Sequence, residues 1–302
     1  MQINILFPAD FWDDTAWKRV EQNFVVLAQV AKDLNFKGIV FDDEAYSPSA
    51  LKMANFKFPT KEEISKNPKG YSEWEKEGSE SNPSFDEHAY RNTKYTFKEH
   101  ASKVTARFKS IMQSMVKVNP DLTVLVYNGP SLSHENSNRD NLVVVDMGLP
   151  REHEFLGPIY TGFLEGLGAN ATLHDMGESY RYREDKHFES AYRWRKYDIA
   201  KDNYNDLNSS YHWIVPKEDR ATWSKKSQVG FMVFNQGQDS SYAEFNTKKR
   251  AGINDIKKTL KKALYYSDKY VLYYYEGQDW LLPKAEKSLD KSWMTMMKEV
   301  SK

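Results

Sequence analysis

Acidic residues end three apolar, strand-like segments of this chain, where carboxylates are well placed for acid–base chemistry. The acids are Asp42 and Glu44 after the first segment, Asp175 and Glu178 at the second, and Glu276 after the third. In parallel α/β proteins, active sites form at the carboxyl ends of buried strands. One such acid is often only a helix cap or a structural hydrogen-bond acceptor. The same arrangement repeated three times favours a shared site.

Two of these carboxyl groups could cleave a glycosidic bond. That reaction needs a pair of carboxyls flanking the bond, one of which is kept protonated by its surroundings. We expect Glu178 and Glu276 to serve as the acid and as the nucleophile or base, and Glu44 to compete for either role. Asp42 lies two positions before Glu44, so both point to the same side of a strand. We expect Asp42 to orient groups or contact hydroxyls.

Polar and aromatic side chains near the same strand ends could bind a sugar. The chain holds 19 Tyr, 16 Phe and 8 Trp, and flat rings with one polar atom suit the C–H faces of sugars. Many of these rings must instead fill the core. The predicted substrate-binding residues are Asp175, Tyr46, Trp280, Tyr180, Tyr127, Asn128 and Tyr275.

A metal site is the alternative use of the first acids. Asp42, Asp43, Glu44 and Asp175 offer the oxygen ligands that a hard cation prefers. The spacings His-x-His and His-Glu-x-x-His do not occur, which argues against zinc. Walker loops, G-x-S-x-G elbows and dinucleotide-binding G-x-G-x-x-G motifs are also missing. We therefore expect neither a metal nor a cofactor.

Charge and composition narrow the class of partner. Lys+Arg and Asp+Glu both number 43, so the basic excess of a general nucleic-acid binder is missing. No apolar run approaches the roughly 18 residues of a membrane helix. The chain contains no Cys, which fits either redox compartment. We expect no leader within this sequence, so a secreted or periplasmic location would require a leader already removed.

The segments that must position these acids alternate between strands and helices. Expected strands are residues 38–42, 122–127, 172–174, 229–235 and 270–275; expected helices are 14–34, 85–118, 152–167, 184–207, 253–266 and 283–300. The helix at 152–167 is expected to break at Gly157-Pro158. Such alternation predicts a parallel sheet.

A single α/β domain over residues 1–302 accommodates this pattern. A (β/α)8 TIM-barrel-like fold fits best, with a first strand that is incomplete or irregular, and a doubly wound α/β sheet is the alternative. Residues 48–83 are polar and contain four of the chain's prolines. We interpret them as a long loop inserted after the first acidic strand, of the kind that is often functional.

Three blocks of this sequence resemble a family. Residues 13–17 with 37–46, then 163–178, then 267–280 resemble a largely uncharacterised group of bacterial proteins predicted to be glycosidase-like TIM barrels. Their D-x-E-x-Y pattern matches Asp42, Glu44 and Tyr46. Members of the group often carry more sequence before the first block than this chain does. The resemblance implies a glycosidase-like barrel but transfers no mechanism.

The sequence thus favours a glycoside hydrolase that cleaves a polysaccharide or oligosaccharide. A non-catalytic carbohydrate-binding barrel would keep the aromatic residues without a working carboxyl pair. A metal-dependent hydrolase would use the first acids as ligands. The expected partner is a carbohydrate, with no nucleic acid and no membrane insertion.

Overall fold

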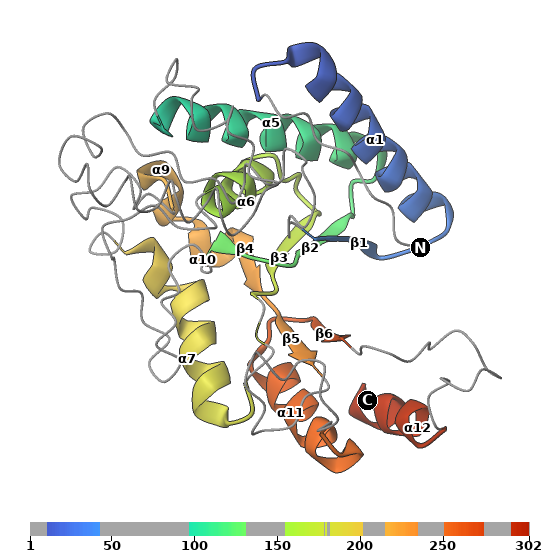
Figure 1. Cartoon of the computed structure of the whole chain (residues 1–302). Helices are drawn as coiled ribbons and strands as arrows, with labels where there is room; N and C mark the ends of the chain where they lie inside the picture. Colours follow the sequence, from blue (N-terminus) through green and yellow to red (C-terminus); the bar gives the residue numbers. More distant parts are fainter. Residues whose placement is uncertain are drawn as a thin grey trace, which may run out of the picture.

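Helices alternate with short parallel strands in this protein (Figure 1). The computed structural model describes residues 11–42, 97–130, 155–177, 179, 182–201, 215–234, 251–274 and 291–301. The helices are α1 (Asp14–Asp33), α5 (Phe97–Val118), α6 (Leu156–Glu165), α7 (Asp185–Lys196), α9 (Lys217–Arg220), α10 (Trp223–Lys226), α11 (Ile253–Tyr266) and α12 (Lys291–Val300), with a 3-10 turn η3 (Asp198–Ala200). The strands are β1 (Gly38–Phe41), β2 (Thr123–Val126), β3 (Thr172–Asp175), β4 (Ser227–Val229), β5 (Phe231–Phe234) and β6 (Val271–Tyr274).

The strands lie side by side in chain order. One sheet has the order β1-β2-β3-β4 and a second pairs β5 with β6, and every pair is parallel. This confirms an α/β fold built on parallel sheets. Among the residues described, the two sheets do not close into a barrel.

Gly230 connects the two sheets. Its amide donates to the carbonyl of Asp175 at 2.8 Å, and the next amide, of Phe231, donates to Tyr270 O at 3.4 Å. The segment of β4 and β5 therefore changes its hydrogen-bonding partner from β3 to β6 within two residues. The single strand expected over 229–235 is observed as the two strands β4 and β5.

The sheets have two different faces. Val124, Val126 and Leu173 lie on the helix face, in the core shared with α1, α5 and α6. Val229 of β4 and, in the second sheet, Phe231 and Val233 of β5 pack against residues of α7 and α11. The alternate residues form the second face, where Leu125, Tyr127, Met176, Leu272, Met232, Phe234 and Tyr274 cluster.

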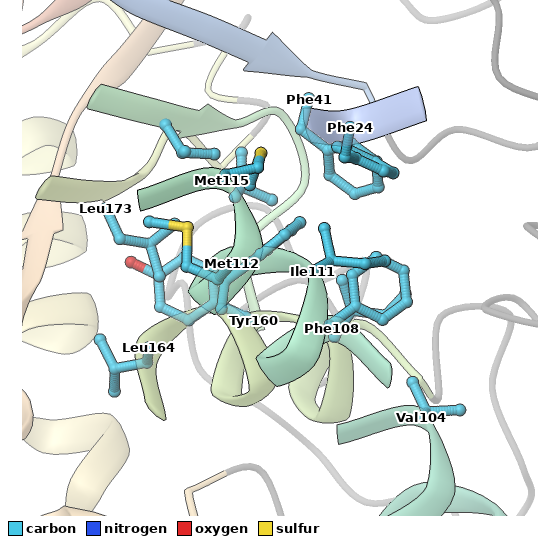
Figure 2. Packing of buried hydrophobic residues seen from close by; sticks show 14 of the residues in the cluster. Phe24, Phe41, Val104, Phe108, Ile111, Met112, Met115, Tyr160, Leu164 and Leu173 are labelled. Atoms are coloured by element: carbon cyan, nitrogen blue, oxygen red, sulfur yellow. The ribbon is translucent and has the colours of Figure 1, made fainter. Parts of the chain in front are cut away.

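Several aromatic rings pack together in the core between α1, α5, α6 and the sheet (Figure 2). The ring centroid of Phe163 lies 5.1 Å from that of Phe108 and 5.3 Å from that of Phe41, both edge to face. Such pairs stabilise a core beyond their buried area.

α1 begins at the expected residue and ends one residue before the expected end. Asp13 Oδ1 accepts a hydrogen bond from Ala16 N at 2.9 Å and so caps the first turn. At the other end Asn35 adopts φ +55°, and Phe36 N donates to Ala31 O at 2.7 Å. This left-handed turn directs the chain into β1.

Two helices differ from expectation. Pro158 does not break α6, because it lies in the first turn, where an amide has no intrahelical partner to lose. α7 ends at Lys196 rather than continuing toward residue 207. The short helices α9 and α10 were not expected from the sequence.

α5 lies very close to two glycines, Gly162 within α6 and Gly166 directly after α6. A Cβ at Gly162 would lie 2.5 Å from the carbonyl oxygen of Thr105, and one at Gly166 would lie 2.6 Å from Lys109 O. Backbone atoms cannot move away as a flexible side chain can. The contact therefore requires glycine.

We expect Gly162→Ala to lower the free energy of unfolding by about 1–3 kcal/mol, because the added methyl must push α5 from α6. Gly168→Ala is the matched control, since its Cβ would meet Val116 at an ordinary 3.6 Å. Urea unfolding of both variants measures the difference. Equal stabilities would contradict the close helix contact.

Candidate active site

Four of the predicted site residues lie at one edge of the first sheet. Asp42 follows β1, Tyr127 and Asn128 follow β2, and Asp175 ends β3. Tyr127 N donates to Phe41 O at 2.8 Å and Met176 N donates to Val126 O at 2.9 Å, so the ladder continues to this edge. The other predicted residues lie outside the described residues: Glu44, Tyr46, Glu178, Tyr180, Tyr275, Glu276 and Trp280.

The four described residues do not share one face. Phe41 packs into the helix-face core, whereas Val40 is 52% exposed, so alternation puts Val40 and Asp42 on the second face. Tyr127 belongs to the same face. Asp175 pairs in register with Val126 and lies on the helix face. The first sheet therefore separates Asp42 from Asp175.

Asp175 is closed off from solvent. Its side chain is 1% exposed, and a Cβ at Gly129 would lie 1.7 Å from its Oδ1, so the loop after β2 crosses directly over the carboxylate. Burial raises the pKa of Tyr160 well above its usual value, and the negative charge of Asp175 raises it further. Asp175 is therefore enclosed by other parts of the protein, as expected of a residue with a structural role. That it contacts sugar hydroxyls stays a prediction.

Arg195 of α7 holds the end of β3 in place. Its guanidinium is buried and donates to Gly177 O at 2.6 Å, Gly230 O at 3.2 Å and Met176 O at 3.3 Å. Gly177 adopts φ +52°, and a Cβ there would lie 2.1 Å from the guanidinium carbon. One side chain thus fixes both the loop after β3 and the point where the two sheets meet.

A second set of hydrogen bonds anchors the same loop to β5. Ser179 Oγ accepts from Met232 N at 2.7 Å and donates to Met232 O at 3.1 Å. Arg183 donates to Phe234 O at 3.3 Å. The positions on either side of 178 are therefore held, Gly177 by α7 and Ser179 by β5.

Sequence reasoning missed Arg195 and Ser179. A signal for Arg195 exists, because it shares a helical stripe with Phe188 and Ala191 at spacings of seven and four, and that stripe is buried. An arginine within the apolar stripe of a helix indicates that buried hydrogen-bond acceptors lie nearby. Ser179 carries no comparable signal.

His174 is a buried base beneath this edge. It is 1% exposed on the second face, opposite Leu125, and neither ring nitrogen has a hydrogen-bond partner among the described residues. The ring of Tyr270 meets it edge to face at 4.9 Å. Burial lowers the pKa of His174 to about 4, although the charge of Asp268 acts in the opposite direction.

An ion pair joins α7 to the chain just before β6, beside β4. Lys196 Nζ lies 2.8 Å from Asp268 Oδ2 and also donates to Ser227 O at 3.0 Å. The same carboxylate accepts from Val229 N at 2.7 Å, and Tyr192 OH donates to its second oxygen at 2.9 Å. Lys196 thus connects α7 to β4 and to the residues before β6.

The described residues contain no group of three or more His, Asp or Glu side chains arranged to hold a metal ion. The helices within the described ranges include none that is both long and apolar enough to cross a membrane.

Comparison with known proteins gives no relative from which a role could be transferred. Neither a family model, nor a curated protein, nor a solved structure matches the chain. The chemistry of the site must therefore be argued from its residues.

Arg195→Met should lower the free energy of unfolding by about 3 kcal/mol, since three buried carbonyls lose a charged donor. Arg193→Met on the same helix is the control, because that side chain is 73% exposed and pairs with Asp198 at the surface. Chemical unfolding monitored by circular dichroism gives both values. A loss below about 1 kcal/mol for Arg195→Met, within the range of a surface pair, would contradict its role.

His174 should make stability depend on pH. The unfolded imidazole takes a proton near pH 6.5 and the folded one only near pH 4, so stability falls as pH decreases between these values. At pH 5 the loss relative to pH 7.5 should be about 2 kcal/mol larger in the wild type than in His174→Leu. Urea unfolding at both pH values measures it, and equal losses would show that His174 titrates normally.

Proposed function

We propose that this protein is a glycoside hydrolase with a (β/α)8-type barrel, acting on a polysaccharide or oligosaccharide. The described strands support the barrel, because they follow chain order and are all parallel. A doubly wound sheet would reverse its strand order at a switch point, and the described strands contain no such reversal. β1 and β6 each pair with a single neighbour among the described strands, and a closed barrel would supply the second.

The functional proposal rests on a regular spacing. It separates the ends of three strands from the predicted acids. On β1, β3 and β6 the last second-face residues are Asp42, Met176 and Tyr274. The acids Glu44, Glu178 and Glu276 each follow one of them by two positions. Two positions is the repeat of one strand face. The spacing thus favours Glu44 and Glu276 directed to the same side at the carboxyl ends of their strands. Glu178 follows Gly177, whose φ of +52° turns the chain at the end of β3.

The second face would suit an acid that must stay protonated. Phe234 and Tyr274 stack there with ring centroids 5.2 Å apart, beside Tyr127 and Met176. A carboxyl near such apolar groups resists ionisation, and a neighbouring carboxylate adds to the effect. The pair we propose is Glu178 and Glu276, with Glu44 as competitor for either role and Asp42 as an orienting group.

The anchoring of the loop after β3 favours Glu178 as one member of the pair. Catalytic groups must be held within a fraction of an ångström of their working positions. Gly177 is held by Arg195 and Ser179 by Met232, so the two chain neighbours of Glu178 are fixed from different elements.

A carbohydrate-binding barrel without a working pair is the main rival, since Tyr46, Tyr180, Tyr275 and Trp280 would bind a sugar with or without catalysis. A metal-dependent hydrolase would instead use Asp42, Asp43 and Glu44 as oxygen ligands. In either case the proposed carboxyl pair would be dispensable for chemistry.

Glu178→Gln and Glu276→Gln should each lower kcat/KM by at least about a hundredfold, because the amide keeps the shape but cannot transfer a proton. The assay is release of reducing ends from a panel of polysaccharides, first with the wild type. Glu189→Gln, an exposed acid of α7, is the control.

Near-normal turnover by either variant would remove that residue from the mechanism. Sugar binding without any cleavage by the wild type would favour the binding barrel. A calorimetric signal with calcium or magnesium that disappears in Asp42→Asn would favour the metal-dependent hydrolase.

A further inference from the structure

One face of α11 combines unpaired lysines with an exposed aromatic ring. Lys258, Lys261 and Tyr265 recur at spacings of three and four, which places them along one side of the helix. All three are exposed, and Tyr265 is 81% exposed. The opposite side of α11 packs on the sheet through Ile256, Leu260 and Ala263. The face of Lys258, Lys261 and Tyr265 therefore points away from the core.

No acid among the described residues forms an ion pair with the lysines of this face. The two other lysines of α11 turn to acids of neighbouring helices, Lys257 to Glu299 and Lys262 to Asp185 at 2.7 Å. Lys258 and Lys261 make no hydrogen bond or ion pair with another described residue. Asp255, in the first turn, is the single acid of α11.

The ring of Tyr265 is held in its exposed position. Tyr266 stacks on the buried ring of Phe188 at 6.5 Å, and Tyr265 meets Tyr266 edge to face at 4.9 Å. The ring stays 81% exposed despite this contact and can offer a flat surface to a ligand. A single exposed apolar residue is common on protein surfaces. The ring of Tyr265 suggests a binding site because two exposed lysines lie on the same side of the helix.

We propose that this face binds an anionic polysaccharide, whose carboxylates or sulfates pair with Lys258 and Lys261 while a sugar ring stacks on Tyr265. The three residues span about 10 Å along the helix, enough for a short stretch of chain. This rests on the proposed function and specifies its substrate class as acidic. Because α11 covers the helix face of the sheet, the contact is a second binding surface outside the proposed cleft.

Charge complementarity favours this partner over nucleic acid. Two unpaired lysines on a protein of zero net charge are far fewer than the phosphate contacts that make nucleic-acid binding strong. A polysaccharide with widely spaced charges needs few cations, and stacking on the ring supplies the rest of the contact.

Affinity electrophoresis in native gels tests the proposal with two probes, polygalacturonate and neutral hydroxyethyl cellulose. The wild type should be retarded by polygalacturonate alone, and the retardation should weaken as salt is added. Lys258→Gln/Lys261→Gln and Tyr265→Ala should each bind at least about fivefold more weakly. Lys217→Gln/Lys225→Gln removes the same charge from exposed positions of α9 and α10 and should bind like the wild type.

Four results would overturn the proposal: no retardation of the wild type, equal retardation in the neutral polymer, equal loss in the control variant, or tighter binding of single-stranded DNA. The gel requires no cleavage, so its outcome is separate from that of the reducing-end assay. Retardation lost in the α11 variants would support this surface even if Glu178→Gln left hydrolysis intact.

Discussion

The guanidinium of Arg195 joins α7 to the end of β3 and to the point where the two sheets meet. It binds the carbonyls that end β3 and the carbonyl of Gly230, where the chain passes from one sheet to the next. Its cost of burial is offset by charge-assisted hydrogen bonds and by the ring of Phe231, which lies 5.5 Å from the guanidinium carbon. Gly177 leaves the room that the guanidinium needs, because a Cβ there would lie 2.1 Å from the guanidinium carbon. The carboxyl edge of β3, and any group placed there, depends on this contact.

Much of the fold follows from local sequence patterns. α11 matches its expected limits at both ends, and α1, β1, β2, β3 and β6 agree with expectation to within about two residues. These elements have clear periodicity and defined caps or turns. The division of 229–235 into two strands was not predictable, because Gly230 changes partners through contacts with Asp175 and Tyr270 that are distant in the chain. Pro158 was misjudged because its effect depends on its position within the helix.

The site is less predictable than the fold. Alternation along β1 and β3 correctly separates residues by face, but it does not reveal that Gly129 lies over Asp175 and closes it off. A sequence shows that an acid ends a strand, whereas its exposure depends on the neighbouring loop. His174 illustrates the same limit, since its unpartnered nitrogens and lowered pKa arise from burial against Tyr270 rather than from a motif.

The central claim is that Glu44, Glu178 and Glu276 meet at one edge of a parallel sheet. The most direct test is a crystal structure with a bound oligosaccharide, in which the distances between their carboxyl groups are measured. The account predicts that two of them lie about 5–5.5 Å apart for a retaining enzyme, or about 6.5–9.5 Å apart for an inverting one. Separations that all exceed about 12 Å, outside both ranges, would contradict it.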